Sequence, residues 1–88
     1  MRPVVERATA LDVLQTAHIA TVRRGARLWF RCPVHRPDNH PSCVIVGEDA
    51  KGWRCFACGA RGGVLDLVVA LGIADDRASA ARWLEVNL

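Results

Sequence analysis

The sequence predicts a small α+β domain organised around one metal site, and three observations lead to this fold class. Two close pairs of potential metal ligands, Cys32 with His35 and Cys55 with Cys58, each enclose two residues. Short stretches of alternating apolar and polar residues flank these pairs, as expected for the strands of an antiparallel sheet. Apolar stretches with helical spacing lie toward both ends of the chain, so short helices are expected to flank the sheet.

The chain has 88 residues, and residues 1–88 are expected to form a single domain. A domain of this size buries a modest share of its surface and is usually reinforced by disulfides or by a metal. The histidine in one close pair and the lack of a secretory signal pattern favour the metal over two disulfides. For the same reasons we expect a cytoplasmic protein in a reducing compartment. No apolar run reaches the length of a membrane span, so we expect no membrane association.

Cys32, His35, Cys55 and Cys58 are the predicted ligands of one zinc ion. Two intervening residues allow both side chains of a pair to reach the same ion, and two such pairs complete a tetrahedral set. Four protein ligands leave no open coordination position, whereas catalytic zinc sites keep one. The zinc is therefore expected to be structural, and a zinc hydrolase is excluded.

Three further residues compete as ligands. Cys43 and His40 each lack a partner at two-residue spacing. Cys43 begins an apolar strand and is expected to behave as a small buried hydrophobe. His40 is expected to form a hydrogen bond within its loop or to face solvent. His18 is expected to end a helix, where a histidine contacts the negative end of the helix dipole.

Local patterns place the helices and strands. Thr9 and Asp12 have the spacing of a capping box, which predicts that a short helix begins there. Gly25 is expected to turn the chain between two strands, and residues 59–63 are expected to form a flexible bend. Strands are expected at residues 26–31, 43–46 and 53–56, with strand character at 19–22, and further helices at 64–71 and 77–86.

Alternation along the strand at 26–31 places Arg27, Trp29 and Arg31 on one face. If Cys55 and Cys32 both point toward the metal, Arg54 shares that face. The chain carries 12 basic and 9 acidic residues, and its first forty residues hold seven arginines against three acids. Arginine favours planar contacts with phosphates and bases, so this face suits a polyanionic partner. The alternative is that Trp29 covers a helix and that the arginines are only solvated.

The two ligand pairs and the stretches around them resemble the N-terminal zinc-binding domain of bacterial-type, DnaG-like DNA primases, the Cys-His-Cys-Cys zinc finger. The sequence departs from that family at Cys43, where an aromatic or large apolar residue is usual. The matching stretches, which span nearly the whole chain, are Arg24-Gly25, Trp29, Cys32-Pro33-Val34-His35, Pro41-Ser42, Cys55-Phe56-Ala57-Cys58-Gly59, Gly62 and Val64-Leu65-Asp66-Leu67.

The resemblance implies a zinc ribbon, in which an antiparallel sheet is flanked by short helices around one structural Zn²⁺. It also implies a role in DNA replication, namely contacting the single-stranded DNA template and helping to set the start of the primer. Polymerisation in that family belongs to a separate TOPRIM catalytic domain. This chain shows no carboxylate cluster of the kind that holds Mg²⁺. It is therefore expected to be a non-catalytic component of a primase system or primosome.

The expected partners are the single-stranded template and either a TOPRIM primase catalytic domain or a replicative helicase. The residues expected to contact DNA are Arg27, Trp29, Arg31 and Arg54. The alternative function is a standalone zinc ribbon that docks on replication proteins without reading the template.

Overall fold

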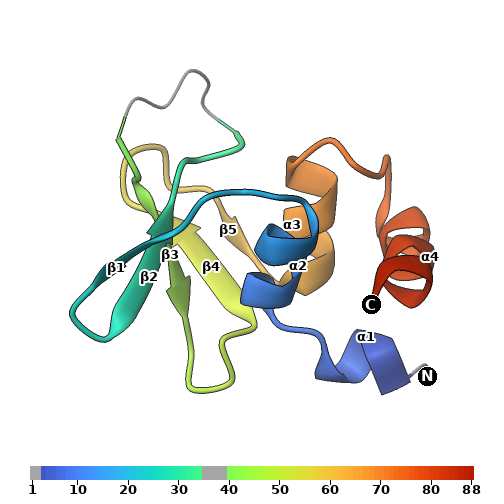
Figure 1. Cartoon of the computed structure of the whole chain (residues 1–88). Coiled ribbons are helices and arrows are strands. Elements are labelled where there is room, and N and C mark those ends of the chain that lie inside the picture. The colour runs from blue at the N-terminus through green and yellow to red at the C-terminus, as the bar shows by residue number, and fades with distance from the viewer. Residues whose placement is uncertain (1–2, 35–39) are drawn as a thin grey trace.

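A computed structural model, which describes residues 3–34 and 40–88, shows a five-stranded antiparallel sheet with its helices on one side (Figure 1). The predicted α+β class is confirmed. The strands are β1 (Val22–Arg24), β2 (Arg27–Phe30), β3 (Cys43–Val46), β4 (Gly52–Cys55) and β5 (Arg61–Gly62). The helices are α1 (Pro3–Arg7), α2 (Ala10–Thr16), α3 (Val64–Ala70) and α4 (Arg77–Asn87).

The strands lie in the sheet in chain order, so each pairs with its neighbours along the sequence. The strands predicted at 26–31, 43–46 and 53–56 correspond to β2, β3 and β4, and each predicted end differs from the observed end by at most one residue. Gly25 has a φ of 61° in the turn between β1 and β2, a left-handed conformation that glycine adopts without steric cost. The prediction of a flexible bend at residues 59–63 was wrong in part, because two of these residues form β5, which pairs with β4.

Side-chain hydrogen bonds lie at the N-terminal ends of three of the described helices. The backbone N–H of Thr9 donates to the Asp12 carboxylate at 2.9 Å, and the Asp12 N–H donates to the Thr9 hydroxyl at 3.1 Å. This confirms the predicted capping box at α2. At α4, Asp76 accepts from the N–H of Ser79 at 2.7 Å. At α3, Asp66 accepts from the N–H of Gly63 at 2.9 Å.

Asp66 also connects the two C-terminal helices, because its carboxylate lies 2.6 Å from the guanidinium of Arg77. The N–H of Gly63 and the neighbouring Arg77 hold the pKa of Asp66 below its usual value. The same side chain explains the glycine at position 62. A Cβ added there would lie 2.5 Å from the Cβ of Asp66, so only glycine lets β5 pass this close to α3.

The hydrophobic core lies between the inner face of the sheet and the helices. Phe30 and Trp53 extend from the sheet with ring centroids 6.4 Å apart, and the Trp53 indole N–H donates to the Gly63 carbonyl at 3.0 Å. Leu14, Leu67 and Leu84 pack against them from α2, α3 and α4, and all three are fully buried. In the part of the chain that the structure describes, no helix has the length and apolar character needed to cross a membrane.

Candidate functional site

The cysteines predicted to bind zinc lie where β2 and β4 end. Cys32 follows β2, Cys55 is the last residue of β4, and Cys58 lies in the turn after it. The sulfur atoms of Cys32 and Cys58 are 3.7 Å apart. Four sulfurs around a tetrahedral zinc at about 2.3 Å lie about 3.8 Å from one another, so this separation fits a shared ion. His35, the fourth predicted ligand, lies outside the described residues and stays a prediction.

Backbone N–H groups point at the sulfurs of both predicted ligand pairs. The sulfur of Cys55 accepts from the N–H groups of Ala57 and Cys58 at 3.3 and 3.5 Å. The sulfur of Cys32 accepts from the N–H of Val34 at 3.4 Å, again two residues along the chain. Donors of this kind favour the thiolate over the thiol, and zinc binds the thiolate. The donor set therefore fits zinc, which Cys32, Cys55 and Cys58 would hold.

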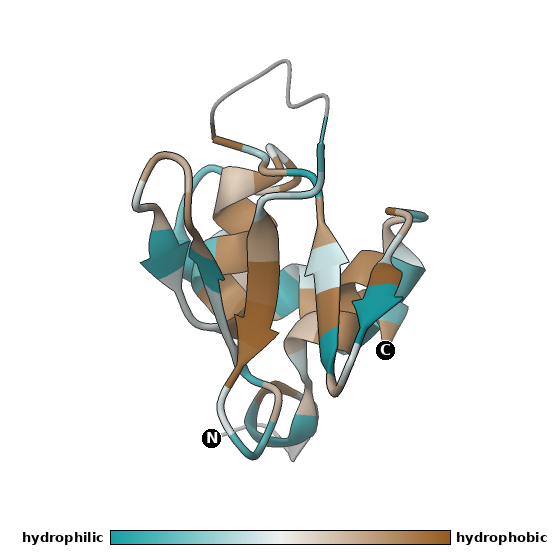
Figure 2. Cartoon of the chain, turned by 90° about the vertical axis from the view of Figure 1, so that its left-hand side faces the viewer, coloured by the Kyte–Doolittle hydropathy of each residue, from teal (hydrophilic) through white to brown (hydrophobic). Residues whose placement is uncertain are grey.

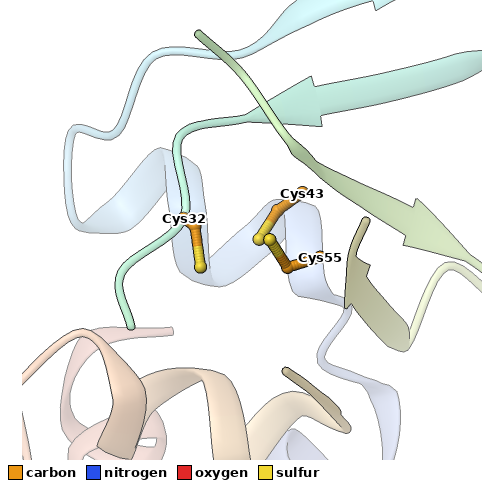
Figure 3. Close-up of side chains that lie close together, drawn as sticks. All are labelled: Cys32, Cys43 and Cys55. Carbon is orange, nitrogen blue, oxygen red and sulfur yellow. The ribbon is translucent and has the colours of Figure 1, made fainter. Parts of the chain in front are cut away.

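Cys43 also lies beside these sulfurs. It is fully buried, as expected, but its sulfur lies within 4.8 Å of those of both Cys32 and Cys55. Figure 3 shows the Cys43 and Cys55 side chains extending toward one another, with Cys32 next to them. Burial raises the pKa of the Cys43 thiol, and its contacts with Cys32 and Cys55 raise it further. Ligand spacing along the chain could not reveal this neighbour, because strand pairing brings it to the site.

The two competing histidines are both exposed. His18 follows α2 with a φ of 59°, so it lies just beyond the helix that it was expected to end. His40 follows the undescribed stretch of the loop.

The strand register defines a second candidate site, the outer face of the sheet. Trp29 pairs with Val44, Val44 with Arg54, and Arg54 with Arg61, so these four side chains form one row across the sheet. The outer face comprises Val22, Arg24, Arg27, Trp29, Val44, Val46, Arg54, Phe56 and Arg61, where Phe56 follows β4 in phase with Arg54. Arg31 follows β2 in the same phase and is exposed.

Four of the outer-face side chains form a continuous stacked row, which we define as Arg24, Trp29, Phe56 and Arg54. The ring centroids of Trp29 and Phe56 are 5.6 Å apart. The guanidinium of Arg24 lies 5.7 Å from the Trp29 ring, and that of Arg54 lies 5.0 Å from the Phe56 ring. Both distances are in the range of cation–π attraction. Phe56 is 57% exposed, so the row presents both aromatic surface and positive charge to solvent.

Trp29 alternates along β2 with Phe30, which is fully buried in the core, so Trp29 points to the other face of the sheet. The helices lie on the core side of the sheet (Figure 1). The alternative that Trp29 covers a helix is therefore wrong. Trp29 and Arg54 instead flank Val44, which is fully buried although it lies on the outer face. Figure 2 views this face, with hydrophobic β3 at the centre and hydrophilic stretches on the outer strands.

Sequence reasoning missed three charged or aromatic members of the outer face, namely Arg24, Phe56 and Arg61. Phe56 lies two residues after Arg54, and residues two apart along a strand share a face, so the sequence could have placed Phe56 on the outer face. Arg24 and Arg61 are identified by strand pairing, since they lie opposite Arg27 and Arg54. Arg54 and Arg61 also border a shallow hollow, which is lined by Val46, Trp53, Arg54, Arg61 and Gly62.

Residues 2–82 match the family model of the CHC2 zinc finger, a zinc ribbon of the DnaG type. The matched stretch contains the predicted zinc ligands and the whole outer face. Comparison with curated proteins finds no match.

Proposed function

This chain belongs to the CHC2 zinc finger family, and from that premise we propose that it contacts single-stranded DNA as the zinc-binding module of a primase system. The family supports a DnaG-like zinc-binding module. The observation that carries the proposed DNA contact is the stacked row of Arg24, Trp29, Phe56 and Arg54.

The aromatic pair, an exposed Phe56 beside a half-buried Trp29, suits unpaired bases. Stacking of a base on an aromatic side chain contributes about 1–3 kcal/mol and tolerates any base, because each base has a π face. In a duplex those faces already stack on neighbouring bases, so the rings of Trp29 and Phe56 would gain little from double-stranded DNA. The arginines at both ends of the row, with Arg27 and Arg61 beside them, supply the cations for the phosphates.

The metal centre fixes the strands that carry this face. Cys55 lies between Arg54 and Phe56, and Cys32 directly follows Arg31. Because side chains alternate along a strand, the cysteine sulfurs point inward while their neighbours point outward. The bound ion would contribute structure alone, by holding the ends of β2 and β4 together. Cys32 and Cys55 thereby keep Trp29 and Phe56 in stacking position.

We place polymerisation in a separate TOPRIM catalytic domain, and the proposed protein partner of this module is that domain or a replicative helicase. This part of the proposal rests on the family match alone. The matched region is a zinc finger of the DnaG type, and in DnaG-like primases polymerisation belongs to a separate domain. The module would then position the template strand for its partner and take no part in phosphoryl transfer.

Anisotropy of a fluorescently labelled single-stranded oligonucleotide tests the proposed DNA contact. If three to four phosphates are engaged, the affinity is expected to fall roughly 20- to 50-fold between about 50 and 200 mM salt. A duplex of the same sequence is expected to bind more weakly, because its bases are not free to stack.

The double variant Arg27→Ala/Arg54→Ala should make the affinity for the single strand depend less steeply on salt, because fewer phosphates are then contacted. Arg82→Ala, which removes an exposed arginine from α4, is the matched control and should leave the salt dependence unchanged. The proposal is wrong if wild type does not bind the single strand at low salt. Binding of a replication protein without any DNA binding would support the alternative, a docking module.

A further inference from the structure

The shallow hollow lies beside the stacked row, on the side of the outer face formed by β4 and β5. Three of its five lining residues, Val46, Arg54 and Arg61, belong to the outer face. The hollow has a volume of about 540 Å³, which lies in the range of small-molecule sites in proteins. Arg54 belongs both to the hollow and to the stacked row, so the two are continuous along the outer face.

Gly52 keeps this hollow open. It pairs with Val46, so position 52 lies on the outer face. A Cβ added there would lie 3.0 Å from Cγ2 of Val46 and 3.8 Å from the carbonyl oxygen of Gly62, and both residues line the hollow. The φ of Gly52 is not positive, so the backbone conformation does not require a glycine at this position. The missing side chain instead leaves space between Val46 and β5.

Arg54 and Arg61 place two like charges beside the hollow. They lie directly opposite one another on β4 and β5. The Cys55 N–H donates to the Ala60 carbonyl at 2.7 Å, so residues 55 and 60 are hydrogen-bonded. Arg54 and Arg61 are therefore a non-hydrogen-bonded pair, in which side chains approach most closely and like charges repel. Among the described residues, no carboxylate forms an ion pair with either arginine, so a ligand with hydrogen-bond acceptors would offset this repulsion.

The two guanidinium groups differ in what they contact. That of Arg54 lies 5.0 Å from the centroid of the Phe56 ring and is engaged in the stacked row. Arg61 is exposed, and in the part of the chain that the structure describes it has neither a cation–π partner nor an ion pair. Its five N–H donors are therefore available to a ligand in the hollow.

We propose that the hollow binds one guanine base of the single strand and that Arg61 recognises this base. Guanine presents two adjacent acceptors, O6 and N7, which match the paired donors of a guanidinium. Adenine and cytosine present an amino donor, which arginine cannot accept, and thymine presents a single acceptor beside its methyl group. The apolar side chain of Val46 suits the face of a base, whereas a phosphate alone would gain nothing from it.

The inference rests on the proposed contact with single-stranded DNA and sharpens the role of Arg61 in it. Neighbouring strands of a sheet lie about 4.8 Å apart, so a DNA strand whose bases stack on Trp29 and Phe56 can reach β5 with its next nucleotide. The guanidinium of Arg61 would face the edge of that base, while Arg24, Arg27 and Arg54 remain the cations for the phosphates.

Anisotropy with labelled oligothymidines of one length tests the guanine site. One strand carries a single central guanine, a second carries 7-deazaguanine at the same place, and a third is thymine throughout. We expect wild type to bind the guanine strand roughly 5- to 150-fold more tightly than the all-thymine strand. 7-Deazaguanine stacks as guanine does but lacks N7, so the second strand should lose most of this preference.

Three variants assign the preference to the hollow. Arg61→Lys should remove the guanine preference and keep the affinity for oligothymidine, because lysine preserves the charge but not the paired donors. Gly52→Ala should also weaken the preference, because its methyl group enters the hollow without a change of charge. Arg27→Lys is the matched control, since it changes an outer-face arginine on β2, away from the hollow, and should keep the preference.

Equal binding of the guanine and all-thymine strands by wild type would overturn the guanine site and leave the proposed DNA contact standing. A preference that survives in Arg61→Lys, or that 7-deazaguanine retains in full, would also overturn the site, because stacking strength would then account for it. If wild type binds none of the strands at low salt, the proposed function fails, and the guanine site fails with it.

Discussion

Removal of zinc is expected to unfold most of the domain. The binding of structural zinc contributes about 10–16 kcal/mol in zinc-finger peptides, whereas whole domains are stable by only about 5–15 kcal/mol. In this chain the ion would join β2, β4 and the turn after β4, and a small core lies beneath them. Circular dichroism and thermal unfolding, with and without a chelator, measure the effect.

A double variant tests the same expectation without a chelator. Cys32→Ser/Cys55→Ser removes one thiolate from each predicted ligand pair, so the domain should be unfolded or loosened even with zinc present. Ala57→Ser is the matched control, because it places a serine in the same turn and keeps every cysteine. A double variant as well folded as wild type, or a chelated protein with an unchanged melting curve, would contradict a structural role for zinc.

Loss of the aromatic pair is expected to weaken binding of single-stranded DNA while leaving the fold intact. Trp29→Ala removes one stacking surface, worth about 1–3 kcal/mol, which corresponds to a roughly 5- to 150-fold higher Kd. Phe56→Ala should have an effect in the same direction, and the double variant should bind more weakly than either. Both rings lie on the outer face, so the core beneath the helices keeps its packing.

Trp83→Ala is the control for the loss of an indole. Trp83 lies on α4 and packs partly against the core on the helical side of the sheet. This variant should keep the affinity of wild type, provided that circular dichroism shows it to be folded. An unchanged Kd in folded Trp29→Ala would remove the stacked row from the DNA contact.

Sequence patterns predicted the features that depend on neighbours along the chain. Thr9 and Asp12 indicated the start of α2, because a capping box is made by residues three apart. Alternation along β2 separated Trp29 from Phe30 correctly, and the observed register extends the same separation to Arg54 on β4. The zinc ligand pairs are equally local and stay a prediction, while the family match over residues 2–82 supports a zinc-binding module.

Features that depend on pairing across the sheet could not be predicted in this way. β5 has only two residues in a glycine-rich stretch, and its pairing with β4 alone defines it as a strand. Cys43 was interpreted as a buried hydrophobe, and its burial was confirmed. Its position opposite Cys55 depends on the register of β3 against β4, which ligand spacing does not encode. The contact between Arg24 and Trp29 depends in the same way on the pairing of β1 with β2.

We expect zinc to hold the stacked row in place for a DNA single strand. The most direct test is to titrate one labelled oligonucleotide with zinc-loaded, chelated and zinc-reloaded protein at constant salt. Chelation is expected to raise the Kd by at least the stacking contribution, roughly 5- to 150-fold, and added zinc is expected to restore it. Equal affinity of the zinc-loaded and zinc-free protein would contradict this expectation.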